Sequence, residues 1–143
     1  MDAFTITNFL GTDPENKSLL NFDKSDMDLT GNNLSNMVII DADLSNKILV
    51  NVDLSNSVLI GTTFRDTDLT GANLSGIISN GKYLVGTILR EADLTGANIA
   101  GIDLSGRDLT GTILRDTDLS NKDLTGTILR EADLTGANIA GID

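Results

Sequence analysis

The sequence contains no cysteine, no histidine and no tryptophan. Without cysteine the chain can form neither a disulfide nor a thiol-based catalytic or metal site. Without histidine it lacks the side chain that most often acts as a general base or a metal ligand near neutral pH. Four Phe and one Tyr supply the only aromatic bulk, so the core has to be aliphatic. These absences argue against an enzyme, a metal site and a bound cofactor.

Long hydrophobic runs and positive charge are also scarce. No segment approaches the roughly 20 apolar residues that a membrane-spanning helix needs. The N-terminal MDAFTITNFL carries an Asp and no basic residue, which is unlike a signal peptide. We therefore expect a cytoplasmic protein with no membrane contact. The net charge of −11 disfavours direct binding to nucleic acid and is compatible with a basic protein partner, such as a DNA-binding surface.

What the sequence does contain is a repeat. The segment 86–103, GTILREADLTGANIAGID, recurs letter for letter as 126–143. Units of five residues place Leu or Ile at their centre, and the same phase runs along the chain with few exceptions, such as Pro14, Lys24 and Ser79. A period of five fits neither a helix, with 3.6 residues per turn, nor a strand, with a period of two. Sustained periodicity of this kind predicts a solenoid, in which each unit buries its apolar face against its neighbours.

The units ADLSN, TDLTG and ANLSG, at 42–46, 67–71 and 72–76, show the full pattern. Counting from the central residue i, position i−2 is mostly small and i−1 is mostly Asp or Asn. Position i+2 is mostly Gly or Asn, which tolerate tight corners. This series resembles the pentapeptide-repeat family, whose consensus is A(D/N)LXX, over about residues 27–143. The resemblance implies an all-β fold: a right-handed quadrilateral parallel β-helix with four pentapeptides per coil and with i and i−2 pointing inward.

Four pentapeptides per coil would divide the chain into about seven 20-residue coils, a rod about 34 Å long at the ~4.8 Å spacing of stacked strands. Residues 1–26 fit the pattern poorly, and we interpret them as a degenerate N-terminal coil or cap. Residues 27–143 form the regular β-helix of the same single domain, with no evident C-terminal cap. The central leucines are expected to stack as a core ladder, represented by Leu44, Leu54, Leu69, Leu74, Leu94, Leu104, Leu124 and Leu134.

Outward-facing apolar residues are the first candidate binding feature. They occur in MVIID, SVLIG and IISNG, which recur once per expected coil, and in KYLVG around the next corner. Contiguous apolar surface on a soluble protein often marks a contact site. We therefore predict an interaction patch of Val38, Ile40, Val58, Ile60, Ile78, Tyr83 and Val85. The alternative is that β-branched residues are present there for their strand propensity.

The aspartates at i−1 are the second candidate feature. On one side of the expected rod they form an acidic ladder that could face cations or a basic partner, with members Asp23, Asp43, Asp103 and Asp123. The simpler interpretation is that Asp or Asn at i−1 serves the fold, as the family consensus implies. A calcium-binding loop needs clustered oxygen ligands and a sharp turn at a glycine. The sequence contains no such loop, so we expect no metal site.

Basic residues occupy two unexpected kinds of position. Lys47, Lys82, Arg107 and Lys122 lie at inward i−2 positions. Because an unpaired charge is costly in an aliphatic core, we expect their charged heads to reach solvent at the corners. Arg65, Arg90 and Arg115 each precede an acidic residue, and we expect exposed ion pairs of about 0–1 kcal/mol there.

Two functions remain open. The repeat predicts a non-catalytic scaffold or protein–protein interaction module, an acidic rod with an exposed apolar stripe. The alternative is DNA mimicry, because some proteins of the family that this chain resembles imitate duplex DNA and bind a type II topoisomerase such as gyrase, as in quinolone resistance. Duplex DNA would carry roughly 20 charges over such a rod, at one per about 1.7 Å, against −11 here. Stacking of the C-terminal coil on a second copy would give a homodimer.

Overall fold

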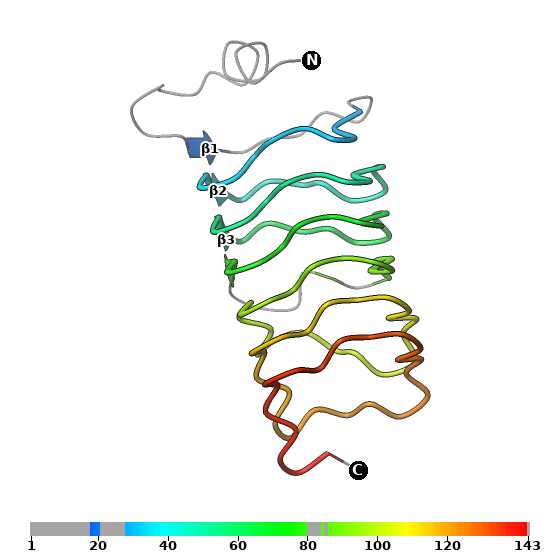
Figure 1. Ribbon diagram of the computed structural model, residues 1–143. Helices are drawn as coiled ribbons and strands as arrows, with labels where there is room; N and C mark the ends of the chain where they lie inside the picture. The colour runs from blue at the N-terminus through cyan, green and yellow to red at the C-terminus, as the bar shows by residue number, and fades with distance from the viewer. Residues whose placement is uncertain (1–17, 21–27, 80–83, 85, 143) are drawn as a thin grey trace.

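The computed structural model describes residues 18–20, 28–79, 84 and 86–142, which wind as a stack of coils (Figure 1). Its strands are β1 (Ser18–Leu20), β2 (Val38–Ile40), β3 (Val58–Ile60) and β4 (Ile78–Ser79). They form one parallel sheet in the order β1-β2-β3-β4. None of the described residues is helical, so none belongs to a helix that could cross a membrane.

Residues in equivalent positions of successive coils pair with one another along the stack. Val38 pairs with Val58, and Val58 with Ile78. Isolated bridges keep this offset outside the strands, from Asn33–Asp53 to Asp118–Asn138. The offset equals four pentapeptides, so the five-residue period of the sequence becomes a coil whose equivalent sides lie on top of one another. The all-strand solenoid predicted from the sequence is therefore present. The predicted cap, residues 1–26, falls almost entirely outside the described residues.

Position i+2 turns the chain at the corners. The backbone φ is positive there, for example 57° at Asn46 and 66° at Gly71, and Gly and Asn adopt this region most readily. Position i−1 supports the same corner. Asp68 Oδ1 accepts the Thr70 N–H at 3.0 Å, as Asn73 Oδ1 accepts the Ser75 N–H at 3.1 Å. Because Asp and Asn do this equally well, the local hydrogen bond accounts for the preference at i−1.

Threonine at i−2 joins one coil to the previous one from inside the core. Thr67 Oγ1 donates to Leu44 O at 2.7 Å, and Thr117 Oγ1 donates to Leu94 O at 3.0 Å. Both threonines are almost completely buried. Burying a hydroxyl costs free energy unless it finds a partner, and a main-chain carbonyl of the previous coil supplies one.

The central leucines form the predicted core through most of the stack. Leu44, Leu54, Leu69, Leu74, Leu94 and Leu104 are at most 2% exposed. Leu124 and Leu134 are different, because they are only partly buried.

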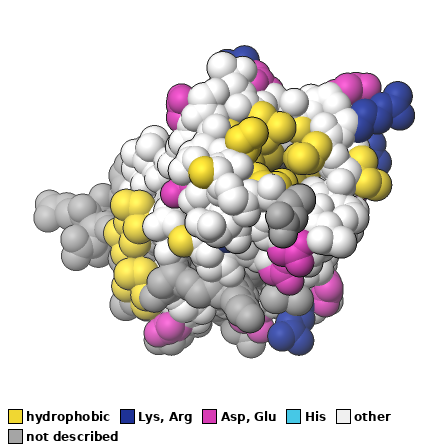
Figure 2. Space-filling model, turned by 90° about the horizontal axis from the view of Figure 1, so that it is seen from below, with side chains coloured by type: hydrophobic (Ala, Val, Ile, Leu, Met, Phe, Trp, Pro, Cys, Tyr) yellow, Lys and Arg dark blue, Asp and Glu magenta, His cyan; other side chains and the backbone are white. Residues whose placement is uncertain are grey.

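These two residues belong to the last described coil, which no further described coil covers. Ile139, in the same coil and also at a central position, is 60% exposed. Figure 2 views the molecule from this C-terminal end and shows hydrophobic side chains gathered there. Leu124 and Leu134 therefore pack against the core, as the predicted ladder requires, but with less burial than the other leucines.

Candidate functional site

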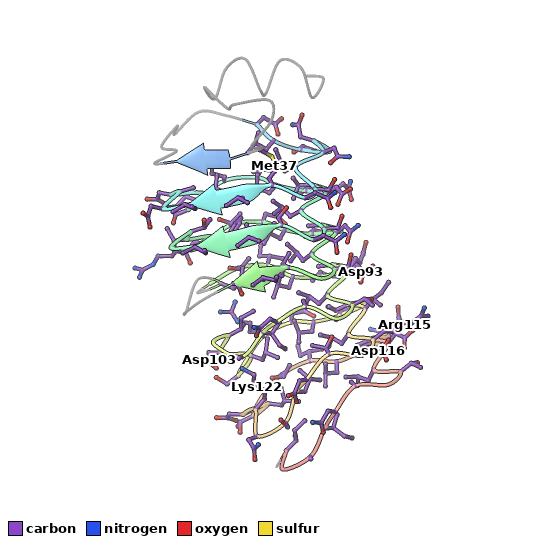
Figure 3. The ribbon with its side chains drawn as sticks, turned by 90° about the vertical axis from the view of Figure 1, so that its left-hand side faces the viewer. Met37, Asp93, Asp103, Arg115, Asp116 and Lys122 are labelled. Carbon is purple, nitrogen blue, oxygen red and sulfur yellow. The ribbon has the colours of Figure 1, made fainter. Side chains whose placement is uncertain are left out.

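Strands β2, β3 and β4 bring the predicted apolar patch together. The register places Val38, Val58 and Ile78 in one row and Ile40 beside Ile60 in a second row. Figure 3 shows these strands stacked on one side of the rod. Ile60 is 41% exposed and Ile78 is 58% exposed, while the other three are partly exposed. Tyr83 and Val85, which were predicted to extend the patch, lie outside the described residues.

Carboxylates border this apolar face where β2 ends. Asp41 directly follows β2, turns the chain with a φ of 53°, and is exposed. Asp43 lies just beyond it and is also exposed. Hydrogen bonds from Ser45 lower the pKa of Asp43, with a smaller lowering from the charges of Lys47 and Arg65. The apolar rows therefore meet negative charge where β2 ends, whereas Gly61 occupies the equivalent corner after β3.

The predicted acidic ladder is not continuous. Asp43 pairs with Thr63 in the next coil rather than with another aspartate. Asp103 and Asp123 are equivalent residues one coil apart, and the charge of Asp103 partly opposes the lowering of the Asp123 pKa that hydrogen bonds from Thr125 produce. Asp23 lies outside the described residues. In the described part of the chain, no group of acidic residues is arranged to hold a metal ion.

Hydrogen bonds within single corners dominate the electrostatics of these aspartates. Asp133 shows the largest effect: the Thr135 hydroxyl and N–H, together with Arg115, lower its pKa to about 2. The same local bonds from Thr110 and Ser120 lower the pKa values of Asp108 and Asp118. Aspartates are ionised at neutral pH in any case, and these hydrogen bonds keep the carboxylates charged at more acidic pH.

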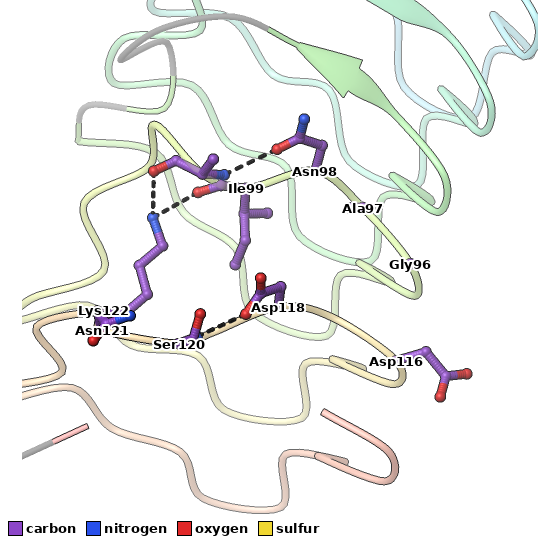
Figure 4. Close-up of a pocket in the computed structure, with 10 residues that line it drawn as sticks. Gly96, Ala97, Asn98, Ile99, Asp116, Asp118, Ser120, Asn121 and Lys122 are labelled. Carbon is purple, nitrogen blue, oxygen red and sulfur yellow. Dashed lines mark hydrogen bonds between the residues drawn. The ribbon is translucent and has the colours of Figure 1, made fainter. Parts of the chain in front are cut away.

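Two cavities of about 530 Å³ each open beside inward-pointing cations. The first lies between segments 96–100 and 116–122, with Lys122 at its edge (Figure 4). The Lys122 ammonium donates to the carbonyls of Ile99 and Ala100, both at 2.7 Å, and of Ile102 at 2.9 Å. Burial lowers the pKa of Lys122, and the charges of Asp103 and Asp118 oppose that change.

The second cavity lies between segments 86–90 and 103–108, beside Arg107. The Arg107 guanidinium donates through Nε to Asp103 O at 2.7 Å and through Nη1 to Thr87 O at 2.9 Å. Arg107 and Lys122 remain partly exposed, as expected, but main-chain carbonyls also hold their charged heads. Lys47 is only 8% exposed, and Lys82 lies outside the described residues.

Two of the corner arginines, Arg90 and Arg115, pair differently from the expectation. Arg115 Nε meets Asp133 Oδ2 at 2.6 Å, and Arg90 Nε approaches Asp108 Oδ2 at 3.8 Å. Both partners lie in the next coil of the stack rather than at the adjacent position in the sequence. The stacking of coils supplies the partner of these two arginines, whereas Arg130 pairs with the adjacent Glu131 at 3.4 Å. The exposure of these pairs keeps each contribution small.

The prediction also missed three exposed isoleucines on another side of the rod. Ile48 is 61% exposed, Ile88 is 46% exposed and Ile128 is 51% exposed. All three occupy i−1, and their regular spacing of two coils was the signal that could have revealed them. Asp68 lies between the first two, since it pairs with both. These isoleucines are therefore isolated and do not form a continuous apolar face.

The repeat pattern and the coil register agree with one family model, described as pentapeptide repeats (8 copies), which matches residues 39–76, 80–111 and 108–141. The chain belongs to the pentapeptide-repeat family. Among solved structures, this pentapeptide-repeat protein is similar to HetL, involved in heterocyst differentiation regulation in the cyanobacterium Nostoc sp. strain PCC 7120. The identity is 28%, the TM-score is 0.41, and the match covers 84% of this chain and 56% of HetL.

Two further structures are similar to this pentapeptide-repeat protein. One, from the Arabidopsis thaliana thylakoid lumen, is 28% identical with a TM-score of 0.33, covering 81% of this chain and 63% of that one. The other, a trypsin-treated form of the plasmid-mediated fluoroquinolone resistance protein QnrB1, is 22% identical with a TM-score of 0.32, covering 81% and 76%. The chain spans less than two thirds of the first two structures. No curated protein matches the sequence.

Proposed function

We propose that this protein is a non-catalytic scaffold that binds a protein partner through the apolar face of β2, β3 and β4. The observation that carries the proposal is the register, which joins aliphatic side chains of three successive coils into one partly exposed surface. At the same i−1 position, most other pentapeptides carry Asp or Asn. An apolar area with a negatively charged edge suits a partner surface that presents aliphatic side chains bordered by Lys or Arg.

The proposal includes the finer architecture: a right-handed quadrilateral β-helix of about seven coils. The constant offset of all described pairings supports it. A rod of this kind displays side chains on flat sides rather than enclosing a reaction centre, so the proposal has no catalytic step.

Photo-crosslinking tests the binding face. A photoreactive residue in place of Ile78 should capture a partner protein, whereas the same residue in place of Ile48 should not. Ile48 is the matched control, because it occupies the same i−1 position and is 61% exposed, against 58% for Ile78. Ile78→Asp should abolish capture by a crosslinker placed at Ile60, and Ile48→Asp should leave it unchanged. Capture that is equal from both positions, or unaffected by Ile78→Asp, would refute the proposal.

DNA mimicry is the second candidate, favoured by the net charge of −11 and by exposed carboxylates at the corners, such as that of Asp118. The charge density is about half that of duplex DNA over the expected rod length. The test is inhibition of gyrase supercoiling by the purified protein. No effect near ten micromolar, roughly −7 kcal/mol of binding, would eliminate this candidate and leave the apolar-face proposal intact.

A further inference from the structure

On the regular sides of the rod, each coil is joined to the previous one by main-chain hydrogen bonds. On the side that contains residues 48, 68, 88, 108 and 128, the Ile88 N–H donates to Thr67 O at 2.9 Å. In return, the Leu69 N–H donates to Ile88 O at 2.9 Å, so the pairing is two-sided. The Ile128 N–H likewise donates to Arg107 O at 2.8 Å. The pattern predicts an equivalent bond from Asp108 N–H to Thr87 O.

That bond is missing among the described residues, and the Arg107 side chain takes its place. Arg107 Nη1 donates to Thr87 O at 2.9 Å. In the same described segments, the return bond from Leu89 N–H to Asp108 O is missing as well. The bridge sequence of this side is correspondingly interrupted, since within the described chain Ile88 pairs only with Asp68, and Asp108 only with Ile128.

Farther along the same coil, the Lys122 side chain also takes the place of a main-chain N–H donor. By the regular pattern, the Asp123 N–H would donate to Ile102 O, but Lys122 Nζ occupies that carbonyl at 2.9 Å. Lys122 also holds Ile99 O at 2.7 Å, which is the kind of carbonyl that a threonine hydroxyl binds elsewhere in the stack. Within segment 86–142, no bridge joins residue 98 to 118 or residue 103 to 123.

One side of this turn remains fully paired. Asp93 pairs with Ile113, with Leu94 N–H to Ile113 O at 2.7 Å and Ile113 N–H to Ala92 O at 2.9 Å. The residue at i−2 on this side, Thr112, donates its hydroxyl to Leu89 O at 3.1 Å. In this described turn, three sides therefore lack the bridge while one retains it. Figure 1 shows the C-terminal coils stacked less evenly than those before them.

We infer that Arg107 and Lys122 form a hinged joint between the coil path 87–103 and the coil path 107–123. Each cationic side chain replaces the main-chain N–H of the following residue on a carbonyl of the previous coil. This exchange satisfies the carbonyl and keeps the coils apart on that side. The paired side around Asp93 and Ile113 is the hinge. The two cavities of about 530 Å³ lie on the sides where the coils are held apart.

Amide hydrogen exchange followed by NMR tests the joint in the unmodified protein. Amides with no ladder bond exchange through small local openings, whereas paired amides need larger ones. The amides of Asp108 and Asp123 should exchange at least tenfold faster than those of Ile113 and Ile128. Exchange of Asp108 and Ile128 at equal rates would overturn the inference.

Substitution by threonine tests the role of the cations. In Arg107→Thr and Lys122→Thr, a hydroxyl replaces the cationic head at i−2, as in the regular coils. The freed carbonyls should then accept the N–H groups of Asp108 and Asp123, whose exchange should slow at least tenfold. Lys122→Arg is the matched control, because it keeps a long cationic side chain that can still donate to these carbonyls, and it should not slow exchange at Asp123. Unchanged exchange in both threonine variants would refute the cation-held joint.

A reciprocal variant places a cation where the ladder is intact. Thr67→Arg should interrupt the pairing of Ile48 with Asp68 and accelerate exchange of the Asp68 amide at least tenfold. An Asp68 amide as protected as in the unmodified protein would contradict the mechanism. If this variant does not fold, the two threonine variants still decide the question, because they restore the regular pattern.

Discussion

The exact repetition of segment 86–103 as 126–143 allows burial to be separated from local sequence. Ile99 and Ile139 are the same residue in the same repeated segment, yet Ile99 is 2% exposed and Ile139 is 60% exposed. Replacing each with Ala removes the same atoms, and contributions of the unfolded chain cancel between the two variants. The difference between the two losses of stability therefore reports the position in the stack.

The expected magnitudes follow from burial. Ile99→Ala removes a fully buried side chain and leaves a cavity, so it should cost about 3 kcal/mol, within the roughly 2–5 kcal/mol typical of such changes. Ile139→Ala loses contacts on a surface already open to solvent, with no enclosed cavity, and should cost about 1 kcal/mol or less. The assay is equilibrium urea unfolding followed by circular dichroism, with the m values compared to confirm that the same transition is measured.

A second pair from the same duplication supplies the control. Ile88 is 46% exposed and Ile128 is 51% exposed, so the two Ala variants should have equal costs of about 0.5 kcal/mol. Equal losses for Ile99→Ala and Ile139→Ala would refute the reasoning, because they would mean that the two central positions are equally covered in solution.

Two further predictions concern the polar groups of the coil. Thr67→Val keeps the shape but removes the Oγ1–Leu44 O hydrogen bond of 2.7 Å, and should cost about 1–2 kcal/mol in urea unfolding, whereas the exposed Thr30→Val should stay within about 0.5 kcal/mol. Asp133 has its pKa lowered from 3.8 to about 2 in the folded state, so its contribution to stability should be present above about pH 4 and be lost as the pH falls towards 2. Asp133→Asn should weaken the dependence of the urea midpoint on pH over that range. A pH dependence equal to that of the unmodified protein would contradict the assignment.

The coil could be predicted in detail because its determinants are local. The corner bond from Asp68 to Thr70 lies within a single pentapeptide, and the positive φ of Gly71 belongs to one residue, so each pentapeptide specifies its own turn. The candidate apolar patch was predictable for the same reason: once four pentapeptides make a coil, Val38, Val58 and Ile78 must stack.

Interactions between coils could not be predicted from the pentapeptides. Arg107 and Lys122 occupy inward positions, and the rule against unpaired buried charge suggested an escape to solvent. That rule gave no weight to the main-chain carbonyls of the previous coil, which accept hydrogen bonds from these partly exposed side chains. The partner of Arg115 was missed in the same way, because Asp133 is distant in sequence but adjacent in the stack.

The sequence by itself determined the period, the corners, the inward positions and the family of this protein, since all of these depend on residues within one or two pentapeptides. Only the tertiary structure decided how deeply each inward residue is buried and which carbonyl each inward cation binds. Leu94 and Leu134 show the physical reason, because two identical pentapeptides differ in burial solely through what lies above and below them.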